Sequence, residues 1–368
     1  MNQKKALHIN SYFLTNRIHY NFFKGVTAYR PDNFLIPVYK HFKEDHIEGM
    51  DIDYVFSGID KKIFFTKIFK VLGLFYKKKL DRDVDYIHAH TLISDGIPAY
   101  ILSRLLKKKY VVTIRSTDVD FFIAGSSVFR IIAKRILADA SMVFLVSPPH
   151  QKRIDALYPG LVSNKLFFLP NGIDKFWLEN IYDRSSQQKT FETVNILFVG
   201  QIITRKKLDV LIEFISKYND KRYNLTIVGK NTLELDFAEI SKHIKEGNSI
   251  NYLGEIRDPN RLLQVYREND IFVLLSYSET FGVVYIEALS QGLPIVYTRN
   301  DGVDGYFEEG EVGYSCDYNS LDELKQRIDA ILPQYNKMSM NATERAKNFD
   351  WQQLIEKYIT NVNSTLSK

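Results

Sequence analysis

The feature that most constrains this chain is a regular alternation of short apolar runs with longer amphipathic stretches. Runs rich in β-branched and aromatic residues lie at 6–10, 34–38, 54–57, 86–90, 110–115, 142–147, 166–169, 196–200, 225–229, 250–254, 271–276 and 294–298. Helical periodicity appears between them at 61–76, 96–106, 129–138, 208–218, 237–246, 260–267, 283–291 and 321–332. Strands separated by helices of this length are typical of βαβ units and parallel sheets.

The turn signal Asn171-Gly172, followed by a polar aperiodic stretch and a new strand at Val194, marks a domain boundary. We therefore expect an α/β protein with two doubly wound, Rossmann-like parallel-sheet domains facing across a cleft, at residues 1–180 and 181–350. Residues 351–368 are expected to form a C-terminal helix.

The composition of the 368 residues excludes several classes of protein. Cys316 is the single cysteine, so no internal disulfide can form and nothing indicates secretion. No stretch reaches the roughly 18–20 apolar residues that span a bilayer, and the start of the sequence lacks the apolar core of a signal peptide. We expect a cytoplasmic protein.

Charge is distributed unevenly along the chain. Residues 1–174 hold 26 Lys and Arg against 16 Asp and Glu, a net charge of +10, whereas the remainder carries −5. Such asymmetry suggests an anionic partner for the first half, either a lipid surface, a nucleic acid or a phosphorylated substrate. A merely solvated lysine-rich surface is the alternative.

The usual cofactor motifs are absent. No strand is followed by GxGxxG, and the sequence contains no GxxxxGK[ST], HExxH or CxxC. The Asp-x-Asp spacing, seen for example at 51/53, 83/85 and 118/120, is too common in this chain to indicate a cation site, so no metal is expected.

Polar residues and glycines gather instead at the predicted carboxyl ends of strands, where open α/β sheets bind ligands. They include His88, His90, Arg115, Gly200 and Gly229.

The most informative segment is residues 276–292, SYSETFGVVYIEALSQG. A buried strand ends at Ser276, and a helix opens at Phe281, Gly282 and Val283, where free N–H groups form an anion site. Glu279 at the mouth can accept hydrogen bonds from a sugar, and Glu287 inside the helix can hold a vicinal diol such as a ribose. The alternative is that Glu279 only complements the helix dipole and Glu287 lies on a solvated face.

This segment resembles the E-x7-E region of the retaining GT-B glycosyltransferases of the group 1, or family 4, class. Other pieces match in the same order along the chain: YIHAHTLIS at 86–94, VTIRSTD at 112–118, LPNGID at 169–174, ILFVGQIITRKK at 196–207, and the helix beginning near Phe349. The resemblance covers most of the chain from about residue 84.

The resemblance implies transfer of a sugar from a nucleotide-diphosphate sugar, with UDP or GDP as the nucleotide, and with retention at the anomeric carbon. It implies that Lys206, assisted by Arg205, and the helix start at 281–283 bind the diphosphate beside Gly200 and Gly229. Glu287 would hold the ribose and Glu279 the sugar hydroxyls, with no cofactor or metal. It also makes residues 1–180 the acceptor side and packs the C-terminal helix back against them.

Departures from the family pattern affect both sides of the implied site. Gln201 stands where the family has an arginine, and Lys207 where it has a glycine. Arg115 replaces a histidine and cannot act as a base, so it is expected to hold a phosphate or the acceptor. His90 is a candidate for a further site role.

The basic first half suits a lipid-linked or saccharide acceptor of the kind used in bacterial-type surface polysaccharide assembly. Lysines interleaved with aromatic residues over 61–79 predict contact with an anionic membrane surface, at the inner face of the plasma membrane. A nucleotide-sugar epimerase or hydrolase of the same fold, or a non-catalytic nucleotide-sugar-binding protein, remains the alternative. Nucleic-acid binding lacks any recognition motif.

Overall fold

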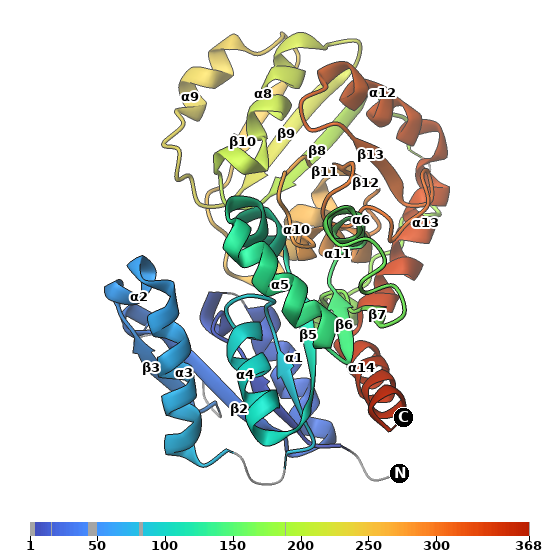
Figure 1. The fold of residues 1–368 in the computed structure, drawn as a ribbon. Helices are drawn as coiled ribbons and strands as arrows, with labels where there is room; N and C mark the ends of the chain where they lie inside the picture. Colours follow the sequence, from blue (N-terminus) through green and yellow to red (C-terminus); the bar gives the residue numbers. More distant parts are fainter. Residues whose placement is uncertain (1–3, 16, 43–49, 81–83, 188, 368) are drawn as a thin grey trace. The chain divides into compact units, whose positions relative to one another are not determined.

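The computed structural model describes residues 4–15, 17–42, 50–80, 84–187 and 189–367. The chain divides into two compact units (Figure 1). Unit 1 comprises residues 1–146, 150–171 and 351–368, and unit 2 comprises residues 147–149 and 172–350. Each unit is built on one parallel sheet, which confirms the predicted α/β class.

Unit 1 has a seven-stranded sheet in the order β3-β2-β1-β4-β5-β6-β7. The strands are β1 (Ala6–Ile9), β2 (Asn33–Tyr39), β3 (Ile52–Phe56), β4 (Tyr86–Ala89), β5 (Lys109–Ile114), β6 (Met142–Leu145) and β7 (Leu166–Phe168). The helices are α1 (Arg17–Tyr29), α2 (Gly58–Lys62), α3 (Phe64–Lys78), α4 (Gly96–Leu106), α5 (Ser127–Asp139), α6 (Pro148–Leu157, which starts in unit 2) and α14 (Trp351–Leu366).

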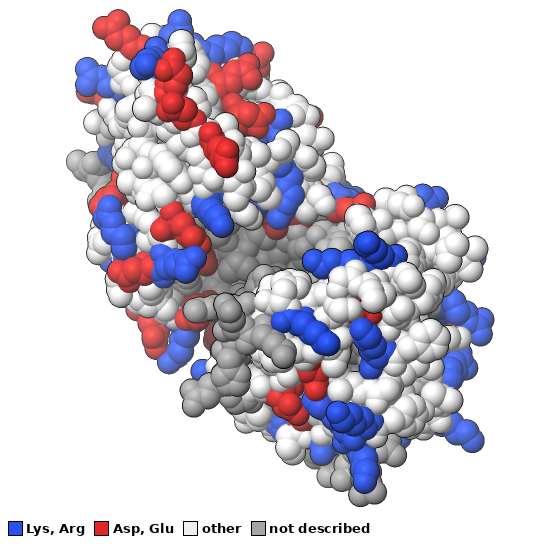
Figure 2. Space-filling view, turned by 90° about the vertical axis from the view of Figure 1, so that its left-hand side faces the viewer, with Lys and Arg blue, Asp and Glu red and all other residues white. Residues whose placement is uncertain are grey.

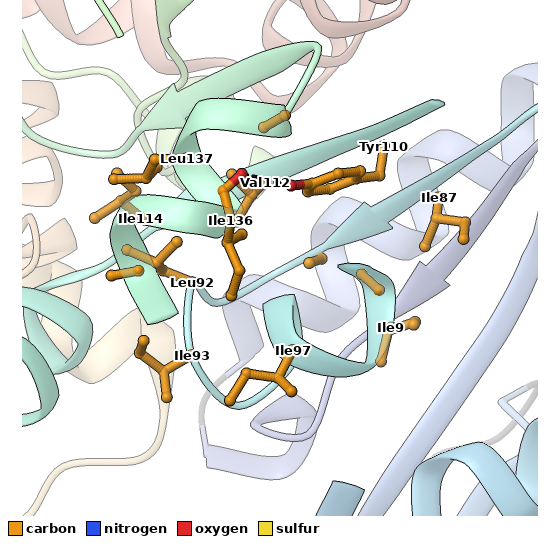
Figure 3. Packing of buried hydrophobic residues seen from close by; sticks show 14 of the residues in the cluster. Ile9, Ile87, Leu92, Ile93, Ile97, Tyr110, Val112, Ile114, Ile136 and Leu137 are labelled. Carbon is orange, nitrogen blue, oxygen red and sulfur yellow. Dashed lines mark hydrogen bonds between the residues drawn. The ribbon is translucent and has the colours of Figure 1, made fainter. Parts of the chain in front are cut away.

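The two faces of this sheet have separate cores. On one face, α3, α4 and α5 pack against alternate residues of β1, β4 and β5, among them Ile9, Ile87 and Val112 (Figure 3). On the other face, α1 and α14 cover the residues between, such as Ala6 and Tyr86. The last helix of the chain therefore packs in the same hydrophobic core as the first strand.

Unit 2 has a six-stranded sheet in the order β10-β9-β8-β11-β12-β13. The strands are β8 (Thr193–Val199), β9 (Arg222–Val228), β10 (Ser249–Tyr252), β11 (Ile271–Leu274), β12 (Ile295–Thr298) and β13 (Gly313–Cys316). The helices are α7 (Lys175–Glu179), α8 (Leu208–Lys217), α9 (Phe237–Ile240), α10 (Pro259–Glu268), α11 (Val283–Ser290), α12 (Leu321–Ile331) and α13 (Tyr335–Ala346).

Several elements differ from the sequence-based expectation. The helix predicted over 61–76 is interrupted at Ile63, whose φ of −116° and ψ of 92° are extended, so that α2 and α3 are separate helices. The helix predicted over 237–246 is only one short turn, α9, continued by a 3-10 turn. Helices α1 and α13 and strand β13 are additional elements that the periodicity did not indicate.

None of the helices in the described part of the chain has the length and apolar character to cross a bilayer.

Candidate active site

The start of α11 is prepared for an anion. Gly282, immediately before the helix, has φ 81°, a conformation that favours glycine. A Cβ at this position would lie 2.6 Å from the ring of Tyr285, so no larger residue fits without movement. The first turn of any helix leaves N–H groups without intrahelical partners, so the start of α11 is a candidate anion site.

The loop before this helix carries Glu279 against two basic residues of the turn that follows β8. Lys206 Nζ lies 2.5 Å from Glu279 Oε2, and Arg205 Nη1 lies 3.5 Å from the same oxygen. Tyr277 N donates to the carbonyl of Arg205 over 3.0 Å, which ties the two loops together through the backbone. The predicted phosphate-binding lysine and the predicted sugar-binding carboxylate are thus neighbours.

Glu279 is ionised in this setting. Burial alone would raise its pKa, but the attraction of Lys206, a hydrogen bond from Lys206 and the charge of Arg205 lower the pKa below its ordinary value. Ser276 Oγ donates a further hydrogen bond over 3.3 Å. Glu279 is therefore a carboxylate that is held ionised beside two cations.

Contacts around this pair define one cluster in unit 2. A Cβ on Gly200 would lie 3.9 Å from Lys206 Cε, and one on Gly282 would lie 3.5 Å from Glu279 Cγ. The strand end at Gly200, the basic turn and the start of α11 therefore face a common region. Lys207 turns elsewhere, with its Nζ 2.9 Å from Asp209, so Arg205 is the cation that accompanies Lys206.

Gly229 and Phe281 have structural reasons for their identity. Gly229 has φ 147°, and a Cβ there would lie 1.9 Å from the carbonyl oxygen of Gly200, so glycine permits the two strand ends to approach. Phe281 is fully buried, with ring centroids 5.5 Å from both Tyr306 and Phe349. Val283 is the first residue of α11, so its backbone belongs to the first turn of the helix.

Glu287 lies more than one turn into α11, apart from the Lys206 cluster, and is held by Tyr266. The Tyr266 hydroxyl donates to Glu287 Oε2 over 3.1 Å. Burial raises the pKa of Glu287 to about 7, with the Tyr266 hydrogen bond opposing the rise and Asp174 adding to it. This carboxyl group is therefore poised to gain or lose its charge near neutral pH.

Asp301 is a site residue that sequence reasoning missed. Its carboxylate accepts hydrogen bonds from the backbone N–H groups of Ser278 (2.6 Å), Glu279 (3.0 Å) and Gly302 (2.9 Å). Ser278 has φ 56°, an uncommon conformation for a non-glycine residue, which these bonds hold in place. The Asn-Asp-Gly sequence at the carboxyl end of β12 was the signal that could have identified it.

His90 and Arg115 lie in unit 1, around a separate cavity of about 20 Å³ that Thr113, Asn171 and Trp351 also line. Arg115 Nε donates to the carbonyl of His90 over 3.2 Å. Burial lowers the pKa of Arg115 to about 10, opposed by Asp118 and Asp95, so its guanidinium stays charged at neutral pH.

The Asp-x-Asp pairs have structural partners. Asp51 and Asp53 both contact Lys78 Nζ, at 2.9 and 2.6 Å, and Asp120 contacts Arg153 at 2.6 Å. Asp118 accepts from the backbone N–H groups of Ile93 and Arg115. Asp83 of the 83/85 pair lies outside the described residues.

The chain is similar to known glycosyltransferases. Residues 182–349 match the family model described as Glycosyl transferases group 1. An uncharacterized glycosyltransferase of Methanocaldococcus jannaschii is 23% identical over 356 residues, which cover 92% of this chain and 94% of the relative.

Solved structures agree on the fold. Anabaena HepE in complex with UDP-glucose superposes with a TM-score of 0.69 at 16% identity, covering 98% of this chain and 99% of that one. The lipopolysaccharide outer core galactosyltransferase WaaB has a TM-score of 0.71 at 14% identity, with 98% and 99% covered. These structures confirm the expected GT-B architecture. Residues 182–349 therefore belong to the glycosyl transferases group 1 family, and the chain as a whole has the GT-B glycosyltransferase fold.

Proposed function

We propose that this glycosyltransferase moves a sugar from a nucleoside-diphosphate sugar to a hydroxyl of its acceptor, with retention of configuration at the anomeric carbon. The observation that carries the proposal is the meeting of Lys206, Arg205 and Glu279 at the start of α11. Two fixed cations and a row of backbone N–H groups are what a departing diphosphate requires.

The roles of the residues follow from their contacts. The diphosphate binds Lys206 and Arg205 and accepts hydrogen bonds from the first turn of α11. Glu279 accepts from hydroxyls of the transferred sugar, while Lys206 keeps it ionised. Glu287 binds the ribose diol. Because side-chain cations neutralise the leaving group, the proposal includes no metal ion.

The reaction exchanges one bond at the anomeric carbon for another. The bond between this carbon and the phosphate oxygen breaks through an oxocarbenium-like transition state. The acceptor oxygen bonds to the same face, and its proton passes to a phosphate oxygen of the departing nucleoside diphosphate. Atoms and charge balance without a covalent enzyme intermediate. The proposal assigns the acceptor to unit 1 and the donor to unit 2.

We also propose a lipid-linked acceptor, used at an anionic membrane surface. An apolar ridge on unit 1 supports this. It consists of exposed residues on α3, on the helical segment Thr117–Ile123 and on α5, namely Phe65, Phe69, Phe121, Val128 and Ile131. Phe69 is 73% exposed, Phe121 70% and Ile131 71%.

Ring contacts connect these elements into one surface. Phe64 packs against Phe65, Phe122 and Phe129 with centroids 5.8, 5.5 and 5.0 Å apart, and Phe121 packs on Phe122 at 5.3 Å. Helices α2 and α3 also carry exposed lysines, Lys61 and Lys77 among them. Figure 2 looks onto the side that carries α2 and α3 and shows blue Lys and Arg side chains spaced by uncharged surface. Apolar and basic groups together suit an anionic lipid surface.

Product analysis with a panel of UDP- and GDP-sugars tests the main proposal. We expect one nucleotide sugar to yield a glycoside with its anomeric configuration retained, in the presence of a polyprenyl-phosphate- or saccharide-type acceptor. Conversion of the donor to an epimer, release of free sugar only, or binding without turnover would each replace the proposal with the corresponding alternative.

Vesicle flotation tests the membrane surface. We expect the chain to float with vesicles containing anionic lipid and not with neutral vesicles, and Phe69→Asp with Phe121→Asp to abolish flotation. Met340→Asp, which changes an exposed apolar residue of unit 2, is the matched control. Equal flotation with both vesicle types, or no loss in the double variant, would refute this part.

A further inference from the structure

Three histidines form a buried cluster in unit 1, on the face of the sheet that α1 and α14 cover. His8 lies in β1 directly beside His88 of β4, and His90 follows β4. Their ring nitrogens lie close enough to hold a metal ion. However, both nitrogens of His88 are engaged, at 2.9 Å each, by the hydroxyls of Tyr358 and Thr113. The cluster is therefore organised by hydrogen bonds.

The direction of these hydrogen bonds follows from one carboxylate. Asp32 accepts from Arg30 Nε over 2.8 Å and from Ala6 N over 2.8 Å. Burial opposes its ionisation, but hydrogen bonding and charge from His8 and then the charge of Arg30 lower its pKa below the ordinary value. An ionised carboxylate only accepts hydrogen bonds, so His8 Nε2, 2.9 Å from Asp32 Oδ2, carries a proton.

The protonation of His8 then determines that of His90. Burial lowers the pKa of His8, so the ring is neutral and its Nδ1 is an acceptor. His90 Nε2 lies 3.0 Å from this Nδ1 and must donate to it. Burial also holds the pKa of His90 well below its ordinary value, so this ring is neutral too. Its remaining nitrogen, Nδ1, therefore carries a lone pair.

The side chain that carries this lone pair lies at the cavity of unit 1. His90 is 3% exposed and lines the cavity with Arg115 and Asn171. Among the described residues, no group donates to His90 Nδ1, although its Nε2 and its carbonyl both have partners. The cavity volume of about 20 Å³ has room for about one hydroxyl or water oxygen.

We propose that Asp32 and His8 are positioning residues that fix the proton of His90 on Nε2, and that His90 Nδ1 accepts a hydrogen bond from a hydroxyl of the acceptor bound by unit 1. The inference rests on the proposed function and adds a group that orients the acceptor. His90 is not the base in this account, because burial disfavours its cation, and the proton of the attacking hydroxyl still passes to the departing phosphate.

The tautomers are tested directly on the unmodified protein. Long-range 1H–15N correlation spectra of the 15N-histidine-labelled chain distinguish Nε2-protonated from Nδ1-protonated rings. We expect both His8 and His90 to be Nε2-protonated. An Nδ1-protonated form or an imidazolium at either position would overturn the inference.

Kinetics of His8→Phe test the consequence for the acceptor. The substitution keeps an aromatic ring among Phe22, Phe23 and Phe34, which surround His8, and removes the partner of His90. We expect kcat/KM for the acceptor to fall at least tenfold while KM for the nucleotide sugar changes less than twofold. His150→Phe is the matched control, because neither ring nitrogen of this buried histidine has a hydrogen bond in the described structure.

The possible outcomes distinguish a failure of this inference from a failure of the proposed function. Unchanged acceptor kinetics in His8→Phe, or an equal loss in His150→Phe, would overturn the inference and leave the proposed function standing. A wild-type chain that transfers no sugar to any acceptor would instead refute the proposed function itself.

Discussion

At the scale of residues, the candidate site contains two glutamates whose pKa values are shifted in opposite directions. Glu279 has a lowered pKa beside Lys206, whereas burial raises the pKa of Glu287 to about 7. The spacing of these two glutamates and the family resemblance indicated them from sequence. Their states did not follow from sequence, because Lys206 is 73 positions from Glu279 and Tyr266 is 21 positions from Glu287.

Glu287 leads to a pH-dependent prediction. A ribose diol donates hydrogen bonds, so nucleotide binding favours the ionised carboxylate. With a pKa of about 7, about a tenth of the protein is ionised at pH 6 and about nine-tenths at pH 8. We expect the affinity of the wild type for its nucleoside diphosphate to rise up to about tenfold over this range, relative to Glu287→Gln.

Titration calorimetry with UDP and GDP at pH 6, 7 and 8 measures this difference, and Glu287→Gln subtracts the titration of the ligand's own phosphate. The free energy of unfolding should change with pH in the direction opposite to the nucleotide affinity, so it should fall as the pH rises. A raised carboxyl pKa stabilises the fold at low pH, and this contribution is lost as pH rises from about 4.5 to about 7. Parallel pH profiles for the two proteins would contradict the role of Glu287.

At the scale of elements, all strands except β13 were predictable from the sequence, whereas several helices were not. Parallel strands buried on both faces are short apolar runs that stand out in the sequence, as β11 does. Helix α13 contains few apolar residues, and β13 is the four residues Gly-Tyr-Ser-Cys. Such elements form because the sheet and its neighbours bury them, which local pattern does not report.

The start of α11 gives a prediction at this scale. Gly282→Ala places a Cβ at φ 81° and 2.6 Å from the Tyr285 ring, so we expect it to destabilise unit 2 and to weaken nucleotide binding. Gly254→Ala is the matched control, since Gly254 has φ 72° with open space around the added Cβ. Backbone strain alone should cost about 1–2 kcal/mol there.

Chemical denaturation and nucleotide titration of both variants measure the two effects. If Gly282→Ala unfolded and bound nucleotide like Gly254→Ala, the close approach of backbone at the start of α11 would have no functional consequence.

At the scale of the whole molecule, the chain ends are joined in one core. Tyr358 of α14 bonds the hydroxyl of Tyr86 over 2.8 Å and His88 Nδ1 over 2.9 Å, in the first half of the chain. A helical tail was predictable from the periodicity of its apolar residues. Its polar partners were not, since they lie about 270 positions away.

Tyr358→Phe removes the partner of His88 Nδ1 and leaves the buried Tyr86 hydroxyl with only its contact to Arg30. We expect it to lower the free energy of unfolding of unit 1 by about 1–3 kcal/mol. Hydrogen exchange of the backbone amides in β1 and β4 measures the stability of unit 1 separately from that of unit 2. The amides of β8 and β11 in unit 2 should exchange as they do in the wild type. Equal protection of β1 and β4 in both proteins would contradict the role of this network.

The central claim is that unit 2 binds the diphosphate of a nucleotide sugar between Lys206 and the start of α11. The most direct test compares the affinities of UDP and UMP (or GDP and GMP) for the wild type, Lys206→Ala and the surface control Lys217→Ala, whose side chain pairs with Asp322. We expect the diphosphate to bind at least tenfold more tightly than the monophosphate in the wild type and the control, and Lys206→Ala to remove most of this preference. A Lys206→Ala protein that keeps the full diphosphate preference would contradict the account.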